Sequence, residues 1–210
     1  MQSRGLREPV QKRSQAALDR MLKVGAQLLQ EQGYAGFTIA ELVRRAKVSP
    51  GLFYGRFESK DSLFYAIQAR ELDRIGREFE ELTAPERWEQ QTLGELLEGL
   101  VTETAAFIEH HAPLFDVFVA RGAVDDVVQQ RSAAFISMFN TRVRDLLLTR
   151  REEITRPDPE RAATVSCQLI SSVFVRLGNV GGVPPEQSLE LPWAELIDEL
   201  PTVCCTYLTN

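Results

Sequence analysis

The side chains with the clearest chemistry lie between residues 38 and 60, where cationic and apolar groups could contact the phosphates and base edges of a nucleic acid. Arg56 carries a guanidinium group, which can donate two hydrogen bonds to one guanine in the major groove. Leu52 can contact the methyl group of thymine. Arg44 and Lys47 are candidates for phosphate contacts from their charge alone, although an ordinary solvated helix face explains Arg44 equally well.

Two short helices joined by a tight turn are expected to position these side chains. Thr38 with Glu41 three residues later is the capping-box pattern, in which the hydroxyl and the carboxylate each satisfy a free backbone N–H. Ser49 is a favoured N-cap and Pro50 a favoured first residue for a second helix, expected over residues 50–56. The pattern predicts a helix-turn-helix, whose second helix enters the major groove of DNA. Apolar residues at helical spacing support the first helix: Ile39, Leu42, Val43 and Ala46.

The apolar pattern of the second helix indicates which of its faces meets DNA. Phe53 and Phe57 are four residues apart and are expected to point inward. The N-terminus of this helix at Ser49 also offers free N–H groups and a favourable dipole to a phosphate. The residues left outward or flanking are Pro50, Gly51, Leu52, Tyr54, Gly55 and Arg56.

Over roughly residues 12–65 the chain resembles the TetR family of transcriptional repressors. The resemblance implies phosphate contacts for Thr38, Tyr54 and Lys60. Two residues depart from the family pattern. Lys47 stands where the turn usually has glycine, and Gly55 stands where a large side chain usually reaches the DNA. The matching residues are Gly33, Tyr34, Thr38, Leu42, Val43, Ala46, Val48, Ser49, Gly51, Phe53, Tyr54, Phe57, Ser59, Lys60, Asp61 and Leu63.

Helical spacing of apolar residues predicts that the rest of the chain is helical as well. Pro113 is expected to end a helix or start the next one, and Pro201 to kink or interrupt the last helix. We expect an all-α fold, with a helix-turn-helix DNA-binding domain and N-terminal arm over residues 1–58 and a helical effector-binding and dimerisation domain over residues 59–210. The other predicted helices cover residues 14–32, 59–82, 92–111, 114–120, 124–151, 159–179 and 193–208.

The resemblance also implies a homodimer and a small-molecule effector. In the family, the last two helices of each subunit form a four-helix bundle with those of the partner, which are residues 159–179 and 193–208 here. Effector binding tilts the helix that follows the DNA-binding domain and changes the spacing of the recognition helices. A mostly apolar cavity with a few polar groups is the usual small-molecule site. The expected lining residues are Phe107, His111, Phe115, Phe118, Phe135, Met138, Arg142 and Phe174, although a core position is the commoner role for each aromatic residue.

Charge is distributed unevenly along the chain. Residues 1–60 contain 11 Lys or Arg and 5 Asp or Glu, whereas residues 61–210 contain 13 and 25. A basic N-terminal segment on an acidic body is typical of a DNA-reading module joined to a body that does not bind DNA. Arg45 is interpreted as an ordinary solvated residue of the first helix. The acidic body predicts a strong salt dependence of DNA binding.

Secreted, membrane and enzyme classes are not favoured by the sequence. The first residues lack the apolar core of a secretory signal, and no apolar run approaches the roughly 20 residues of a membrane helix. The three cysteines are an odd number and fit a reduced, cytoplasmic protein. His110 and His111 diverge by about 100° on a helix, and no metal-ligand, nucleophile or phosphate-loop motif is present. No metal or cofactor is expected.

Two interpretations of the DNA-binding protein stay open. One is a repressor that a small, largely apolar effector releases from a palindromic, double-stranded operator. The other is an effector-independent regulator or activator. A sealed, well-packed body would favour the second, and a cavity would favour the first. Either protein needs a two-fold dimer, because a single helix reads too few base pairs, and its recognition helices would lie about 34–36 Å apart.

Overall fold

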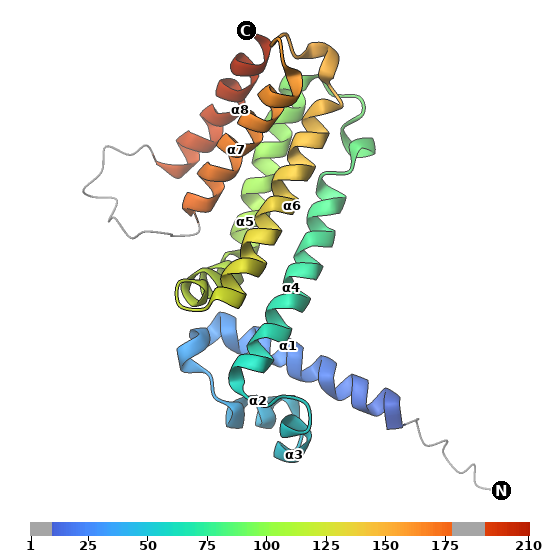
Figure 1. Ribbon diagram of the computed structural model, residues 1–210, viewed down its shortest axis with the longest axis vertical. Helices are drawn as coiled ribbons and strands as arrows, with labels where there is room; N and C mark the ends of the chain where they lie inside the picture. The colour runs from blue at the N-terminus through green and yellow to red at the C-terminus, as the bar shows by residue number, and fades with distance from the viewer. Residues whose placement is uncertain (1–9, 178–191) are drawn as a thin grey trace, which may run out of the picture. The chain divides into compact units, whose positions relative to one another are not determined.

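The computed structural model describes the backbone of residues 10–177 and 192–210, and the side chains of residues 14–175 and 192–210. Over these ranges the chain forms eight α-helices and two short 3₁₀ segments, and no strand (Figure 1). The expected all-α fold is confirmed. The chain divides into two compact units between Glu71 and Leu72, inside helix α4 (Lys60–Leu82), whereas the sequence-based expectation placed the boundary after residue 58. Most of the expected N-terminal arm lies outside the described residues.

The first unit contains α1 (Val10–Gly36), α2 (Ile39–Ala46), α3 (Pro50–Tyr54) and the beginning of α4. Gly33 interrupts the regular helix of α1 with a φ of 67° and a ψ of 178°, a conformation that glycine adopts at little cost. The helix predicted over residues 14–32 is therefore interrupted at the residue that follows it, and the helical span extends on both sides of the predicted range. The apolar side chains that are fully buried in this unit are Met21, Leu28, Leu29, Phe37, Leu42, Phe53, Leu63, Phe64 and Ile67.

The second unit contains the rest of α4 and the helices α5 (Leu93–Gly122), α6 (Asp126–Leu148), α7 (Pro159–Leu177) and α8 (Trp193–Thr209). The 3₁₀ segments η1 (Pro85–Trp88) and η2 (Arg151–Glu153) lie in the connections. Helix α5 packs on α6 and α8, and α7 packs on both α6 and α8 (Figure 1). One core joins these helices, and it includes Phe79, Trp88, Leu96, Leu97, Leu100, Phe139, Leu147, Ile170, Phe174 and Leu208.

Pro113 does not separate two helices, as the sequence suggested, because α5 is one element from Leu93 to Gly122. Proline lacks the N–H that would bond one turn back, so an internal proline normally weakens or bends a helix. Burial of Leu114 and Phe118 on the following turn compensates for that loss by keeping the C-terminal part of α5 packed. In Figure 1 this last part is seen nearly end-on, while the rest of α5 runs along the page.

The remaining helix bounds differ from the predicted ones by a few residues. Helix α6 begins at Asp126 rather than Val124 because the Asp125 side chain accepts hydrogen bonds from the N–H groups of Val127 and Val128, at 3.1 and 3.3 Å. Helix α8 continues through the buried Pro201 as one element. The predicted end of α7 at residue 179 lies outside the described residues. Among the described helices none is both long and apolar enough to cross a membrane.

Candidate nucleic-acid interface

Helix α2 starts at an N-cap made by Thr38. The Thr38 hydroxyl oxygen accepts a hydrogen bond from the N–H of Glu41 at 3.2 Å, as the capping box requires. The reciprocal bond from the backbone N–H of Thr38 to the Glu41 carboxylate is replaced, because that carboxylate is bonded to Arg44 and Arg45. The sequence pattern was therefore correct for the hydroxyl and wrong for the carboxylate.

Helix α3 starts at the expected position and ends sooner than expected. The Ser49 hydroxyl oxygen accepts from the N–H of Leu52 at 3.1 Å, and Pro50 occupies the first turn. The helix ends at Tyr54 with Gly55 as its C-cap, so the predicted span 50–56 was two residues too long. This single short turn of helix is the element that carries the proposed reading face.

The faces of α3 follow the predicted division. Phe53 and Phe57 are buried, with exposed fractions of 0% and 6%. Tyr54 is 60% exposed, and its ring meets Phe53 edge-on with centroids 5.1 Å apart. Arg56 is exposed and donates a hydrogen bond to the Ser14 hydroxyl on α1. The guanidinium proposed to read a base is therefore held from a second helix.

The turn between α2 and α3 contains a strained residue. Lys47 has φ 52° and ψ 49°, which is the left-handed region that side chains other than glycine rarely adopt. Its N–H donates to the carbonyl oxygens of Val43 and Arg44 and so caps α2. The turn thus has the backbone that the family's glycine provides, with a lysine in place of that glycine.

Lys60 begins α4 among aromatic side chains. Its Nζ lies 4.5 Å from the ring centroid of Tyr34 and 4.5 Å from that of Phe37. The Tyr34 hydroxyl in turn donates to the carboxylate of Asp61. These contacts fix the first turn of α4 against the end of α1. The Ser59 hydroxyl, which accepts from the N–H of Ser62 at 3.1 Å, caps the same turn.

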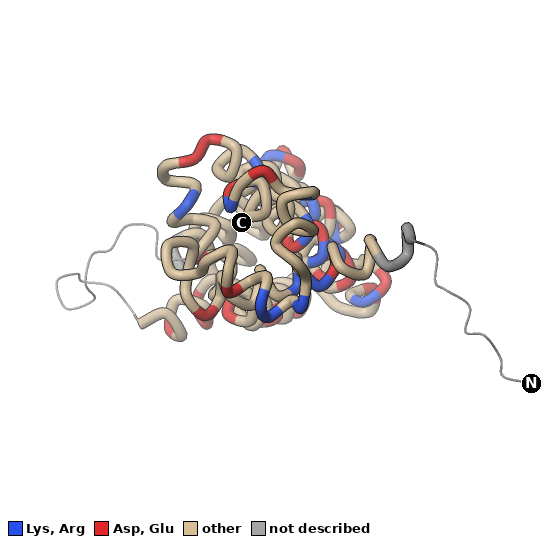
Figure 2. The backbone as a smooth tube through the Cα atoms, turned by 90° about the horizontal axis from the view of Figure 1, so that it is seen from below, with Lys and Arg blue, Asp and Glu red and all other residues tan. Residues whose placement is uncertain are grey.

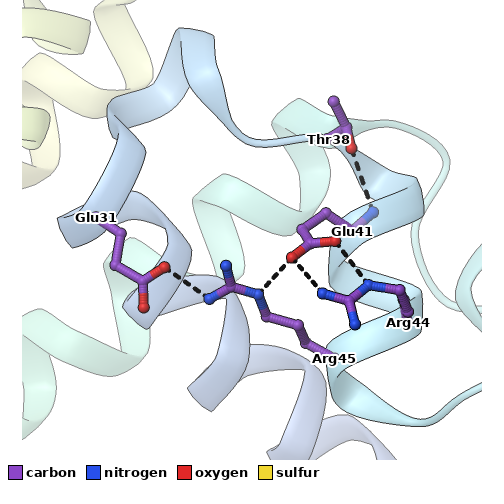
Figure 3. Close-up of polar contacts among 5 residues, drawn as sticks. All are labelled: Glu31, Thr38, Glu41, Arg44 and Arg45. Atoms are coloured by element: carbon purple, nitrogen blue, oxygen red, sulfur yellow. Dashed lines mark hydrogen bonds and ion pairs between the residues drawn. The ribbon is translucent and has the colours of Figure 1, made fainter.

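Four charged residues of α1 and α2 form one cluster (Figure 3). The Glu41 carboxylate accepts from Nε and Nη2 of Arg44, at 2.9 and 2.7 Å, and from Nε of Arg45 at 2.5 Å. Nη1 of Arg45 also donates to Glu31 on α1, at 2.6 Å. The hydrogen bonds from Arg44 and then from Arg45 lower the pKa of Glu41 to about 2. Arg45 is therefore a bridge between α1 and α2, and not the free solvated residue that the sequence suggested.

The second unit contains a cavity of about 120 Å³ that is almost entirely apolar. Leu72 of α4 contributes to its wall together with residues of α5, α6 and α7. Phe115 and Phe135 face each other there with ring centroids 5.9 Å apart. Four of the expected residues are in the lining, and the full set is Leu72, Ile108, Phe115, Phe118, Val119, Ser132, Phe135, Ile136, Phe139, Ser171, Phe174 and Val175.

The other four expected pocket residues lie beside the cavity lining. Met138 and Arg142 border a separate, open depression on α6, and Arg142 pairs with Glu80. Phe107 packs on the buried Phe79 with centroids 5.4 Å apart. The fourth residue is His111, which is buried and contacts Glu78 of α4.

His111 joins α5 to α4 within the second unit. It is only 3% exposed, and its Nε2 lies 2.9 Å from Oε2 of Glu78, which also pairs with Arg74. Burial lowers the pKa of His111, against the opposing influence of the Glu78 carboxylate. Burial would raise the pKa of Glu78, but the positive charges of Arg74 and His111 lower it in sum. The histidine is a buried link between helices and no longer a candidate for direct contact from the cavity wall.

Apolar side chains remain exposed on the last two helices. Val165, Leu169 and Val175 of α7 are 38%, 40% and 42% exposed, and Val203 of α8 is 50% exposed. Exposed residues of α7 recur every three or four positions and form one stripe along the helix, in which these apolar side chains stand beside Arg161, Gln168 and Ser172. Within the described residues, no group of three or more His, Cys, Asp or Glu side chains could hold a metal ion.

Comparison with solved structures supports the fold. A structure from Mesorhizobium loti MAFF303099, assigned to the TetR family, has a TM-score of 0.69 at 18% identity and covers 93% of this chain and 96% of that one. A transcriptional regulator from Cytophaga hutchinsonii ATCC 33406 has a TM-score of 0.64 at 16% identity, with 91% and 96% covered. At these sequence identities the similarity supports the fold and nothing beyond it.

Sequence comparison identifies the family. The HTH-type transcriptional regulator HbdR of Aromatoleum sp. (strain CIB) is 38% identical over 69 residues, which are 31% of this chain and 30% of HbdR, so the chain spans less than a third of that relative's length. Residues 21–67 match the bacterial regulatory proteins of the tetR family, and residues 92–208 match the tetracyclin repressor-like C-terminal domain. The chain belongs to the TetR family of regulators, which are DNA-binding transcription factors and not enzymes.

Proposed function

We propose that this DNA-binding regulator is a repressor, and that a small apolar effector releases it from a palindromic operator by binding in the cavity of the second unit. The observation that carries the proposal is the cavity itself. A regulator without an effector has no use for an apolar cavity in its body, because close packing is the normal state of a protein interior. The cavity is the reason to prefer effector control over effector-independent regulation.

The lining defines the chemistry of the effector. Five phenylalanines and several aliphatic residues form the wall, and the polar side chains among them are the hydroxyls of Ser132 and Ser171. Among the side chains that the structure describes, none of those in the lining is charged. An ionised ligand would lose its hydration there without a counter-charge, which is costly. A volume of about 120 Å³ suits a molecule of roughly one aromatic ring, because a cavity of about 150 Å³ accepts benzene.

The DNA interface is inferred to consist of the residues around α3. Arg56 and Leu52 would contact base edges, whereas Thr38, Tyr54 and Lys60 would contact phosphates. The backbone N–H groups of Ser49 and Gly51 lie at the N-terminus of α3, on either side of Pro50, which has no N–H. Gly55 leaves room for close approach of the backbone. Arg44 and Lys47 complete the set as phosphate contacts. The exposure of Tyr54 and Arg56 beside the buried Phe53 supports this division.

The dimer is inferred to form through α7 and α8. The stripe on α7 and Val203 on α8 contain apolar side chains that are exposed to water in a monomer. Exposed apolar patches favour protein–protein contact. A two-fold axis through this contact would present two copies of α3 to the two halves of a palindrome.

The coupling of effector to DNA is inferred to run along α4. Leu72 on α4 is part of the cavity wall, and the same helix begins at Lys60 in the DNA-binding unit. A ligand that favours one position of Leu72 thereby favours one arrangement of α4. Release requires only that the ligand binds the DNA-competent and the released arrangement with different affinity.

The test uses toluene and indole as probes with a selected operator duplex. We expect at least one probe to raise the melting temperature of the full-length protein and to weaken operator binding. Val119→Phe should abolish both effects by filling the cavity, whereas Ala120→Phe, at an exposed position one residue later, should leave them intact. If the probes bind but operator affinity stays constant, effector release is refuted.

A further inference from the structure

The carboxylate of Glu41 lies between the guanidinium groups of Arg44 and Arg45, on the helix that precedes α3 (Figure 3). It holds Arg44 through both Nε and Nη2, which is the bidentate geometry that guanidinium also uses for phosphate. Arg44 is 71% exposed, whereas the Glu41 side chain is 26% exposed. The exposed arginine is thus already occupied by an anion of its own chain.

Capping of α2 does not explain this carboxylate. The Thr38 hydroxyl caps the helix through the backbone N–H of Glu41, which any residue at this position would supply. Bridging of α1 and α2 does not explain it either, because Arg45 reaches α1 through Glu31, at 2.6 Å. Glu41 also accepts from Nε of Arg45, but that arginine has Glu31 as a second carboxylate partner. The contact that only Glu41 provides is the bidentate pair with Arg44.

The charge of this cluster is unusual for a surface that meets DNA. Two carboxylates, Glu31 and Glu41, stand against two guanidinium groups, so the cluster contributes no net positive charge. Along the described backbone, Asp and Glu positions are interspersed with Lys and Arg positions (Figure 2). Non-specific affinity for DNA comes almost entirely from neutralised phosphates, so a carboxylate on the basic face reduces that affinity.

We propose that Glu41 is a specificity-determining residue of the DNA interface, because it occupies Arg44 until a phosphate replaces it and so weakens binding to non-operator DNA. This inference rests on the proposed DNA interface, in which Arg44 contacts a phosphate. On the operator, the base contacts of α3 fix the register of the helix, so the phosphate reaches Arg44 in a geometry that offsets the loss of Glu41. On other sequences no such register exists, and the exchange is disfavoured.

The experiment compares binding of the full-length protein to a random-sequence duplex and to an operator duplex selected from random DNA, over a series of salt concentrations. Glu41→Gln keeps the backbone N–H for the Thr38 cap and removes the charge. We expect it to bind the random duplex more tightly and to steepen the slope of log affinity against log salt by about one unit, which is about fourfold between about 50 and 200 mM salt. The ratio of operator to random affinity should fall.

Three comparisons separate this role from a general effect of charge. Glu31→Gln removes the same charge from the same cluster but touches only Arg45, so it should change the slope less. In an Arg44→Ala background, Glu41→Gln should lose most of its effect. Melting temperatures report whether each variant is folded.

Three results would overturn the proposal. The first is an unchanged or weaker affinity of Glu41→Gln for the random duplex. The second is an equal effect of Glu31→Gln, and the third is an undiminished effect of Glu41→Gln in the Arg44→Ala background. Failure to select any operator would count against the proposed function instead, since the random duplex still measures the role of Glu41.

Discussion

At the scale of single residues, the chain places one exposed guanidinium beside the recognition helix and anchors it. Arg56 follows the C-cap of α3 and donates a hydrogen bond to Ser14 of α1. Such an anchor restricts the rotamers of a long side chain before DNA arrives, which reduces the entropy lost on binding. In the proposed interface Gly55 offers no side chain to the DNA, so Arg56 would carry a larger share of the base reading.

Substitution of Arg56 should therefore affect sequence discrimination more than general affinity. We expect Arg56→Ala to weaken operator binding by about 1–3 kcal/mol and to relax the preference at one base pair. Arg56→Lys keeps the charge without the two-pronged donor, so it should lose the preference and retain most of the salt slope. Anisotropy titrations on operator and random duplexes measure both. Equal weakening on the two duplexes would make Arg56 a phosphate contact.

Lys47 lowers the stability of the protein through its left-handed backbone conformation, and in the proposed interface it supplies a positive charge for a phosphate. A residue with a side chain loses about 1–2 kcal/mol there, and glycine returns about 0.5–1 kcal/mol of this through its freer unfolded chain. Lys47→Gly should therefore raise the free energy of unfolding by up to about 1 kcal/mol, and lower the salt slope by about one phosphate contact. Lys47→Ala keeps the strain and loses the charge, so it should lower the slope without the gain in stability. Urea unfolding and salt titrations test the pair, and a Lys47→Gly protein no more stable than Lys47→Ala would contradict the account.

At the scale of helices, local signals predicted where elements begin better than where they end. Ser49 and Pro50 correctly placed the start of α3, because an N-cap depends on residues a few positions away. The continuity of α5 through Pro113 could not be foreseen, since it depends on the burial of Leu114 and Phe118 against helices distant in sequence. The true capping box lies at Thr92 and Glu95, where both reciprocal bonds form. The same pattern at Glu41 was wrong because two arginines, at the next turn, compete for the carboxylate.

The cavity shows the same limit for the candidate site. Phe115, Phe118, Phe135 and Phe174 were named as candidates because they are large and apolar, and they do line the cavity. Phe107 and Met138 have the same chemistry and do not. Whether a buried helix residue lines a cavity or packs in the core depends on how the helices pack against one another. The spacing of apolar residues in the sequence does not show this.

The contact between α4 and α5 through His111 predicts a pH dependence of stability. Burial lowers the pKa of His111 below its ordinary value of 6.5, so the unfolded chain binds this proton more readily than the folded protein. The contribution of His111 is complete above pH 6.5 and is lost as the pH falls from there towards the lower folded value. Glu78 and Arg74 of α4 and the neighbouring His110 are the charged and titratable groups that act on it.

Urea unfolding between about pH 7.5 and pH 5.5 tests this dependence. Wild-type stability should fall over the range, at no more than about 1.4 kcal/mol per pH unit from one proton. His111→Gln should flatten the profile whatever its effect on stability at pH 7.5. His110→Gln, at an exposed position, should change the profile much less, because burial and Glu78 act on His111 more strongly than His110 does. Glu78 does not titrate in this range, because its pKa is lowered from 4.5. A profile of His111→Gln parallel to that of the wild type would assign the pH dependence to another group.

At the scale of the whole molecule, the exposed stripe on α7 is proposed to become interior in the dimer. Leu169 lies in that stripe with 40% of its surface exposed. Leu169→Arg would place a charge without a partner in a dry contact, which costs several kcal/mol, so dimer affinity should fall by at least about a hundredfold. Val127→Arg, 43% exposed on α6, is the matched control and should leave the dimer intact.

Sedimentation measures the oligomeric state of both variants, and a palindromic and a half-site duplex measure what dimerisation contributes to DNA binding. A Leu169→Arg monomer should bind the palindrome no better than the half-site, because its two recognition helices are no longer tied together. A Leu169→Arg protein that still sediments as a dimer would move the interface away from this face of α7. A monomer that keeps its preference for the palindrome would instead mean that the two halves are bound by independent copies.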